Sequence, residues 1–174
     1  MLKALLLSVS LLGVSAAYAQ TATETPAAVD VAQVTDPQQF ADMASSSNML
    51  EIETSRLALE KSSSEEVKTF AQHMIDDHGK AGEEMTAAAQ SDGITPATAL
   101  QPHHQSQLDQ LSGLEAEEFD QAYLAAQVAA HDEAVALFQA FSTNGEDSAL
   151  KAFAANTLPT LQQHREEVGA IAGQ

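Results

Sequence analysis

The sequence predicts an all-α fold, a bundle of four long helices. Four segments of about 25 residues carry apolar side chains at three- and four-residue spacing, the pattern of a helix with one buried face. No stretch alternates apolar and polar residues for long enough to form a strand. Helices of this length bury their apolar faces best against one another, so a bundle follows.

The first two predicted helices form a pair. The first runs from Pro37 to Lys61, with Asp36 as its N-cap residue and proline at the first helical position. The second starts at a capping box over residues 63–66 and ends at Asp92-Gly93, where the glycine favours a left-handed conformation. Their apolar stripes are Phe40, Met43, Ala44, Leu50, Leu57 and Ala58, then Val67, Phe70, Ala71, Met74, Ala81, Met85 and Ala88.

The last two predicted helices form a second pair. The third starts at a capping box over residues 112–115 and continues to Thr143, and the fourth covers about residues 146–171. Short turns make each pair an antiparallel hairpin, whereas residues 93–114 are long enough to run the length of the bundle, with a short helix at 105–111. One long crossover between two hairpins is the ferritin-like arrangement.

The N-terminus has the pattern of an export signal. Lys3 precedes an apolar run, and Ala17-Tyr18-Ala19 is an A-x-A cleavage site, so residues 1–19 are predicted to be a signal peptide. The apolar run is shorter than the roughly 20 residues that cross a bilayer, and we expect no transmembrane helix in the mature chain. The periplasm is the expected location, with outer-membrane association or secretion as alternatives.

The rest of the chain divides into a tether and a domain. Residues 20–35 show no helical or strand period and are predicted to be a flexible tether, followed by the bundle domain at 36–174. The chain has no cysteine and a formal charge of −18. The missing thiols exclude disulfides, iron–sulfur sites and cysteine nucleophiles, and the negative charge excludes nucleic-acid binding by a basic surface.

One ionisable side chain on the buried stripe of each helix is the most informative feature for function. These candidates are Glu51, His78, His131 and His164. Three imidazoles and a carboxylate suit Zn, Fe, Cu or Ni, so we predict that the four could hold a metal ion inside the bundle. The alternative is structural: buried histidines hydrogen-bonded to Glu51 or to backbone carbonyls, with no metal.

Other polar groups have weaker predicted roles. Asp77, Asp132 and Glu167 adjoin the candidates and could orient ligands or bind directly. His103-His104 is predicted to lie in a solvated loop. No histidine follows a glutamate by three residues, so the Glu-x-x-His pair of di-iron bundles is missing, and no motif points to a catalytic residue.

Several motifs in order resemble a known bacterial family, domain of unknown function 4142, often labelled a predicted outer membrane protein. They are residues 70–78 (FAQHMIDDH), 119–124 (FDQAYL), 131–132 (HD) and 153–164 (FAANTLPTLQQH). The resemblance covers about residues 36–168, and Asp77-His78 and His131 match family positions. It implies a ferritin-like bundle and carries across no catalytic residues, because the family has no established activity.

Two functions therefore remain open from sequence. The first is an exported bundle that binds a metal ion through the four inward side chains. The second is a non-catalytic envelope or stress-related interaction module without metal, which would have a protein partner in the envelope.

Overall fold

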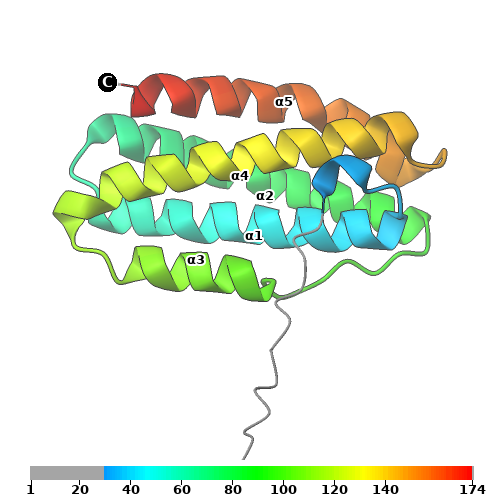
Figure 1. The fold of residues 1–174 in the computed structure, drawn as a ribbon, viewed down its shortest axis with the longest axis horizontal. Coiled ribbons are helices and arrows are strands. Elements are labelled where there is room, and N and C mark those ends of the chain that lie inside the picture. Colours follow the sequence, from blue (N-terminus) through cyan, green and yellow to red (C-terminus); the bar gives the residue numbers. More distant parts are fainter. Residues whose placement is uncertain (1–29, 174) are drawn as a thin grey trace, which may run out of the picture.

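The computed structural model describes residues 30–173, and all regular structure within them is helical (Figure 1). The all-α prediction is thus confirmed for this part of the chain. The elements are a short 3₁₀ helix η1 (Val31–Gln33) and five α-helices, namely α1 (Pro37–Lys61), α2 (Glu65–Ser91), α3 (Pro102–Ser112), α4 (Ala116–Asn144) and α5 (Ala149–Ala172). The predicted signal peptide and residues 20–29 of the predicted tether lie outside the described residues.

The four long helices pack around a common core. α1 packs against α2 and α4, and α5 packs against the same two helices from the opposite corner. α3 lies on the outside of the bundle, mainly against α1, within the connection from α2 to α4 (Figure 1). Because this connection returns along the bundle, α4 runs in the same direction as α2 (Figure 1).

Local sequence signals explain most of the helix ends. Asp36 Oδ1 accepts a hydrogen bond from the Gln39 backbone N–H at 2.8 Å, as its N-cap position predicts. Gly93 has φ 72°, the left-handed conformation expected after α2. The capping box predicted at 112–115 is wrong: Ser112 is the last residue of α3, and Glu115 precedes α4 without a side-chain capping bond.

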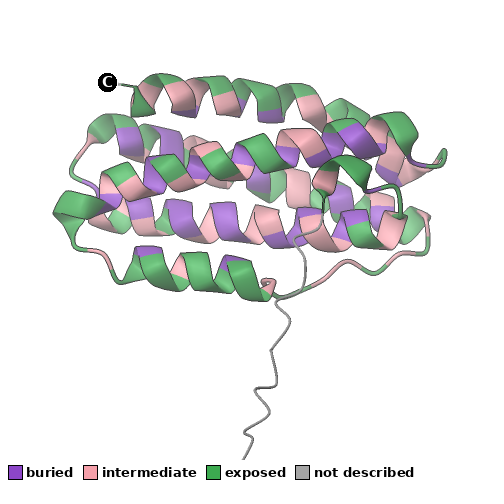
Figure 2. Cartoon of the chain, viewed as in Figure 1, coloured by how far each residue is buried: buried purple, intermediate pink, exposed green. Residues whose placement is uncertain are grey.

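The core consists of two apolar clusters separated by a polar layer. The first cluster includes Phe40, Met85, Phe141 and Leu161, and the second includes Phe70, Met74, Phe119, Tyr123 and Val168. Along α2 and α5 the polar layer falls between Met74 and Met85 and between Leu161 and Val168. Both clusters are closed to solvent, and Figure 2 shows the buried residues on the inner faces of the helices.

Two segments pack more closely than the sequence predicted. Val34, placed in the tether by the lack of periodicity, is 2% exposed and joins the first apolar cluster, while η1 packs on α4. His104 was predicted to lie in a solvated loop, but it is on α3 and buried against α1, with Nδ1 2.6 Å from Ser46 Oγ. Packing of the crossover on α1 explains both its helicity and its burial.

Among the residues that the structure describes, no helix combines the length and the apolarity needed to cross a membrane.

Candidate metal centre

The polar layer contains all four side chains predicted to point inward. Glu51 comes from α1, His78 from α2, His131 from α4 and His164 from α5, and their exposures are 1%, 4%, 0% and 1%. Each lies on the stripe that its helix turns toward the core, between the two apolar clusters. Polar groups removed this completely from water cost free energy unless they find partners.

The three imidazole rings form a nearly equilateral triangle. Their centroids are 5.7 Å apart for His78 and His131, 5.5 Å for His78 and His164, and 5.6 Å for His131 and His164. One ligand atom from each ring lies within 4.8 Å of those of the other two. Three rings on three different helices thus direct nitrogen atoms at one small volume.

Each ring is held from outside by a hydrogen bond to an oxygen atom. The pairs are His78 Nδ1 to Asn48 Oδ1 at 3.0 Å, His131 Nδ1 to the Gln127 backbone oxygen at 2.9 Å, and His164 Nε2 to Asp77 Oδ2 at 3.0 Å. A carbonyl or carboxylate oxygen can only accept, so the outer nitrogen of each ring carries the proton. The inner nitrogen of each neutral ring then carries a lone pair.

Glu51, from α1, lies beside two of the three rings, those of His78 and His131. Its Oε1 accepts a hydrogen bond from Ser47 Oγ at 2.9 Å. Its Oε2 lies 3.5 Å from His78 Nε2 and 3.4 Å from His131 Nε2. These two separations exceed the usual range for a hydrogen bond between nitrogen and oxygen, and more so for a charge-assisted one.

The inner atoms of this group have no hydrogen-bond partner. In the described part of the chain six buried side-chain atoms lack one, and four of the six belong here: Glu51 Oε2, His78 Nε2, His131 Nε2 and His164 Nδ1. Leaving a buried polar atom unpaired costs about 1–3 kcal/mol. Four such atoms at one point form an arrangement that could hold a ligand that accepts lone pairs.

Burial also favours the neutral form of two of the rings, His78 and His164. Removal from water lowers the pKa of His78 below its ordinary value of 6.5, against the opposing attraction of Glu51. Burial lowers the pKa of His164 as well, although its hydrogen bond to Asp77 acts in the opposite direction. Neutral imidazole is the form that binds metal ions.

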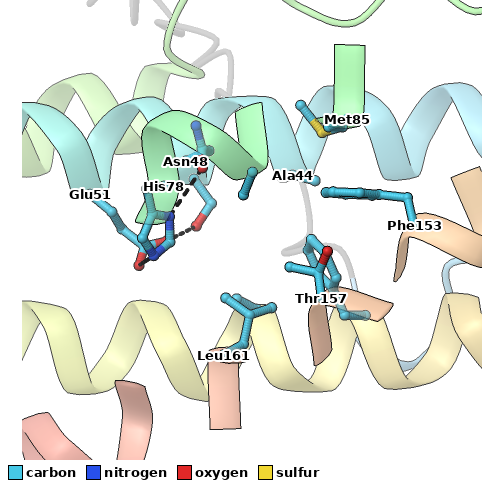
Figure 3. A pocket seen from close by; sticks show the side chains of 12 residues that line it. Ala44, Asn48, Glu51, His78, Met85, Phe153, Thr157 and Leu161 are labelled. Carbon is cyan, nitrogen blue, oxygen red and sulfur yellow. Dashed lines mark hydrogen bonds and ion pairs between the residues drawn. The ribbon is translucent and has the colours of Figure 1, made fainter. Parts of the chain in front are cut away.

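A small cavity of about 30 Å³ adjoins the polar layer. Glu51 and His78 lie at one end, and Met85, Phe153, Thr157 and Leu161 line much of the rest (Figure 3). This volume accommodates about one water molecule, although most of the lining is apolar. The cavity leaves room beside the carboxylate for one small additional ligand.

A second group of polar side chains lies outside the first, at the surface of α2 and α5. Asp77 Oδ2 is 3.0 Å from His164 Nε2 and 3.1 Å from His73 Nε2, and His73 Nδ1 is 3.3 Å from Glu167 Oε2. We call His73, Asp77 and Glu167 the outer cluster. Asp132, also predicted to adjoin the site, instead forms an ion pair with Arg165 at 2.5 Å.

Sequence reasoning missed Asn48, which holds the His78 ring, and Ser47, which donates a hydrogen bond to Glu51. Asn48 and Ser47 precede Glu51 by three and four residues, so helical spacing places them on the same side of α1. His73 was assigned to the outward face of α2, but it lies four residues before Asp77 and contacts it. Helical spacing was the available signal for these residues, because each lies three or four positions from Glu51 or Asp77 on the same helix.

Comparisons with known proteins agree on the helical fold. A DUF305 fragment from Deinococcus radiodurans superposes with a TM-score of 0.69 at 18% identity, covering 80% of this chain and 97% of the fragment. CopM, in a structure of its Cu(II)-bound form, gives a TM-score of 0.64 at 20% identity, covering 78% of this chain and 95% of CopM. At these identities the likeness shows the fold alone.

No curated protein matches the sequence. The profile of a family described as a domain of unknown function, DUF4142, matches residues 20–171. This match confirms the resemblance inferred from the motifs in α2, α4 and α5. The chain belongs to the DUF4142 family.

Proposed function

We propose that this protein binds a transition-metal ion in the polar layer, with Glu51, His78, His131 and His164 as ligands. The observation that carries the proposal is the set of four buried, unpartnered atoms, one from each long helix. The inner nitrogen of each ring presents a lone pair, and Glu51 Oε2 is a carboxyl oxygen beside two of them, so the four atoms together suit a cation.

The distances favour a metal ion over a structural ion pair. A protonated histidine paired with Glu51 would approach it to about 2.7–2.9 Å. A four-coordinate ion with nitrogen and oxygen ligands at about 2.0–2.1 Å separates its ligands by about 3.3–3.4 Å. The observed separations of Glu51 Oε2 from His78 Nε2 and His131 Nε2, 3.5 and 3.4 Å, are close to the second geometry, and binding of an ion would draw the His164 nitrogen in toward them.

The outer hydrogen bonds support the same interpretation. Metal-binding histidines characteristically donate their second N–H to a carboxylate, a carbonyl or water, which fixes the ring and its tautomer. All three rings here have such an acceptor. The alternative function, an interaction module without metal, gives no reason for three rings to share this arrangement.

The donor set suits Zn, Fe, Cu or Ni, and two of these should be tested first. A tetrahedral arrangement of nitrogen and oxygen ligands is typical of Zn²⁺. CopM, one of the structural neighbours, is described in a Cu(II)-bound form, which makes Cu²⁺ the second ion to test. A single carboxylate differs from the carboxylate-rich centres of di-iron bundles.

The proposal includes the setting of the site. Two helix pairs joined by a long connection support a ferritin-like bundle, in which metal sites are built from side chains of facing helices. The N-terminal sequence supports export, with the periplasm as the place where the ion is acquired.

The test is metal content and metal-dependent stability. Protein treated with chelator is titrated with Zn²⁺ or Cu²⁺, and the thermal midpoint is followed by circular dichroism. At 100-fold excess over Kd, binding adds about 2.7 kcal/mol, which raises the midpoint of a domain of this size by about 5–10 °C. We expect one ion per chain and this increase.

A matched control separates the centre from surface histidines. His103→Ala removes an exposed imidazole from α3 and should leave the midpoint increase unchanged. The double variant His78→Ala, His131→Ala should abolish both the increase and the bound ion. Wild-type protein that binds no ion and melts at the same temperature with and without metal would exclude the proposal and leave the interaction module.

A further inference from the structure

The buried centre has no direct contact with solvent. Its three imidazoles and Glu51 have side-chain exposures of 5%, 0%, 2% and 2% for His78, His131, His164 and Glu51. An ion that reaches these atoms must lose its hydration shell inside the bundle, and loss of hydration without replacement ligands is costly. A route lined by ligands is therefore needed.

The cavity beside the centre does not supply such a route. Its walls away from the polar end are mainly the apolar side chains of Met85, Phe153 and Leu161, and the Thr157 hydroxyl is the polar group among them (Figure 3). An ion taking this path would exchange most of its water for hydrocarbon, with a single hydroxyl as a replacement ligand, before reaching Glu51.

The outer cluster offers the ligands that the cavity lacks. His73, Asp77 and Glu167 have side-chain exposures of 41%, 38% and 37%, so all three are open to water. One ligand atom from each of His73, Asp77 and His164 lies within 4.8 Å of the other two, a second arrangement that could hold an ion. Two carboxylates at this point also attract cations.

His164 belongs to both groups. Its Nδ1 faces the buried centre without a partner, and its Nε2 faces Asp77 in the outer cluster. A neutral imidazole has a lone pair on only one nitrogen, so this ring can serve one ion at a time, outside through Nε2 or inside through Nδ1. The His164 ring therefore separates the half-exposed outer cluster from the buried centre and has one nitrogen on each side.

We propose that the outer cluster is a capture site, which takes a divalent transition-metal ion from solvent and passes it across His164 to the buried centre. This inference rests on the proposed function of that centre. Asp77 Oδ2 lies 3.0 Å from His164 Nε2 and 3.1 Å from His73 Nε2. These separations are a few tenths of an ångström shorter than those between two ligands of the same bound ion. Because Asp77 and His73 are half-exposed, small rotations of their side chains can lengthen these separations by that amount.

Transfer proceeds by ligand exchange. The ion leaves His73 and Asp77 as the buried nitrogens and Glu51 replace them, and the proton on His164 moves from Nδ1 to Nε2. Asp77 then accepts the hydrogen bond that the structure shows. Glu167 keeps its position beside His73 Nδ1, where it orients that ring in the capture site.

The experiment measures the rate of loading separately from its extent. Co²⁺ serves as the probe, because its visible d–d absorption reports the four-coordinate centre, and stopped-flow mixing follows the signal in the full chain. The variants His73→Ala and Glu167→Gln alter the capture site. His103→Ala is the control for loss of an exposed histidine, and His131→Ala removes a ligand of the buried centre.

We expect His73→Ala and Glu167→Gln to load about tenfold more slowly or worse while reaching the wild-type final absorption. His103→Ala should load at the wild-type rate, and His131→Ala should lose the signal. Wild-type rates in both capture-site variants, with the signal still lost in His131→Ala, overturn the capture site alone. A wild-type protein without the Co²⁺ signal overturns the buried centre and, with it, this inference.

Discussion

Replacing Glu51 by methionine separates a metal ligand from a structural ion-pair partner. Glu51 is 1% exposed, and its Oε2 faces two histidine nitrogens without a hydrogen bond. Methionine is of similar length and carries no charge. In metal-free protein we expect Glu51→Met to be more stable than wild type, because it removes a buried carboxyl group that has no ion to bind.

The magnitude follows from the contacts of this side chain. The substitution removes one hydrogen bond, from Ser47 Oγ to Oε1 at 2.9 Å, worth about 1.5–3 kcal/mol if the acceptor is charged. It also removes a desolvation cost of several kcal/mol. Replacing buried ionic groups by apolar ones of similar volume is commonly neutral or stabilising by about 1–4 kcal/mol. We expect a gain of about 1–3 kcal/mol.

The assay is urea unfolding in the presence of chelator, followed by far-ultraviolet circular dichroism. A higher midpoint with an unchanged slope shows a change in stability alone. Glu53→Gln is the control, because Glu53 is two residues away, half-exposed, and paired with Arg56. Its effect should stay within about 0.5 kcal/mol.

A large loss of stability would refute the reasoning. If Glu51 were the partner of a charged histidine, its removal would leave that charge buried alone and cost about 3–5 kcal/mol. Glu51→Met should also lose most of the metal-dependent increase in midpoint, so the same variant tests both roles.

Two further predictions concern Gly82, which lies against Asn48 beside the polar layer, and His104 on α3. Gly82→Ala would place its Cβ 3.0 Å from Asn48 Nδ2, whereas the Cβ of Gly79→Ala meets nothing within 4 Å. We expect Gly79→Ala to stabilise α2 by about 1 kcal/mol and Gly82→Ala to weaken metal affinity in a calorimetric titration. Equal metal affinity in the two variants would contradict this expectation. Burial lowers the pKa of His104 from 6.5 to about 4, so the unfolded chain binds more protons between these values. Its contribution to stability is therefore complete above pH 6.5 and is lost as the pH falls toward 4. The variant His104→Asn can still accept a hydrogen bond from Ser46. Its urea midpoint should fall less steeply with decreasing pH over this range than that of the wild type. The same dependence of the midpoint on pH in both proteins would argue against the buried neutral ring.

Helical periodicity made most of the fold predictable. The apolar stripes place the four long helices, and Asp36 and Gly93 mark two of their ends by conformations that these residue types favour. Tertiary packing determined what periodicity could not. Val34 has no periodic neighbours and His104 follows a proline in a polar segment, yet both are buried where the chain packs across α4 and α1.

The candidate site was predictable only in part. A single ionisable residue on an apolar stripe is conspicuous, so Glu51 and the three histidines could be chosen from sequence. The sequence does not show which acceptor holds each ring, because Asn48 and Asp77 act across helix boundaries on His78 and His164. These acceptors fix the proton on the outer nitrogen of each ring, which leaves the lone pair on the inner nitrogen.

The most direct test of the metal centre is anomalous diffraction from crystals of the protein loaded with Zn²⁺ or Cu²⁺. We expect one strong peak in the polar layer, about 2.0–2.2 Å from Glu51 Oε2, His78 Nε2, His131 Nε2 and His164 Nδ1. A metal-saturated crystal with peaks only at exposed side chains, and none among these four atoms, would contradict the account.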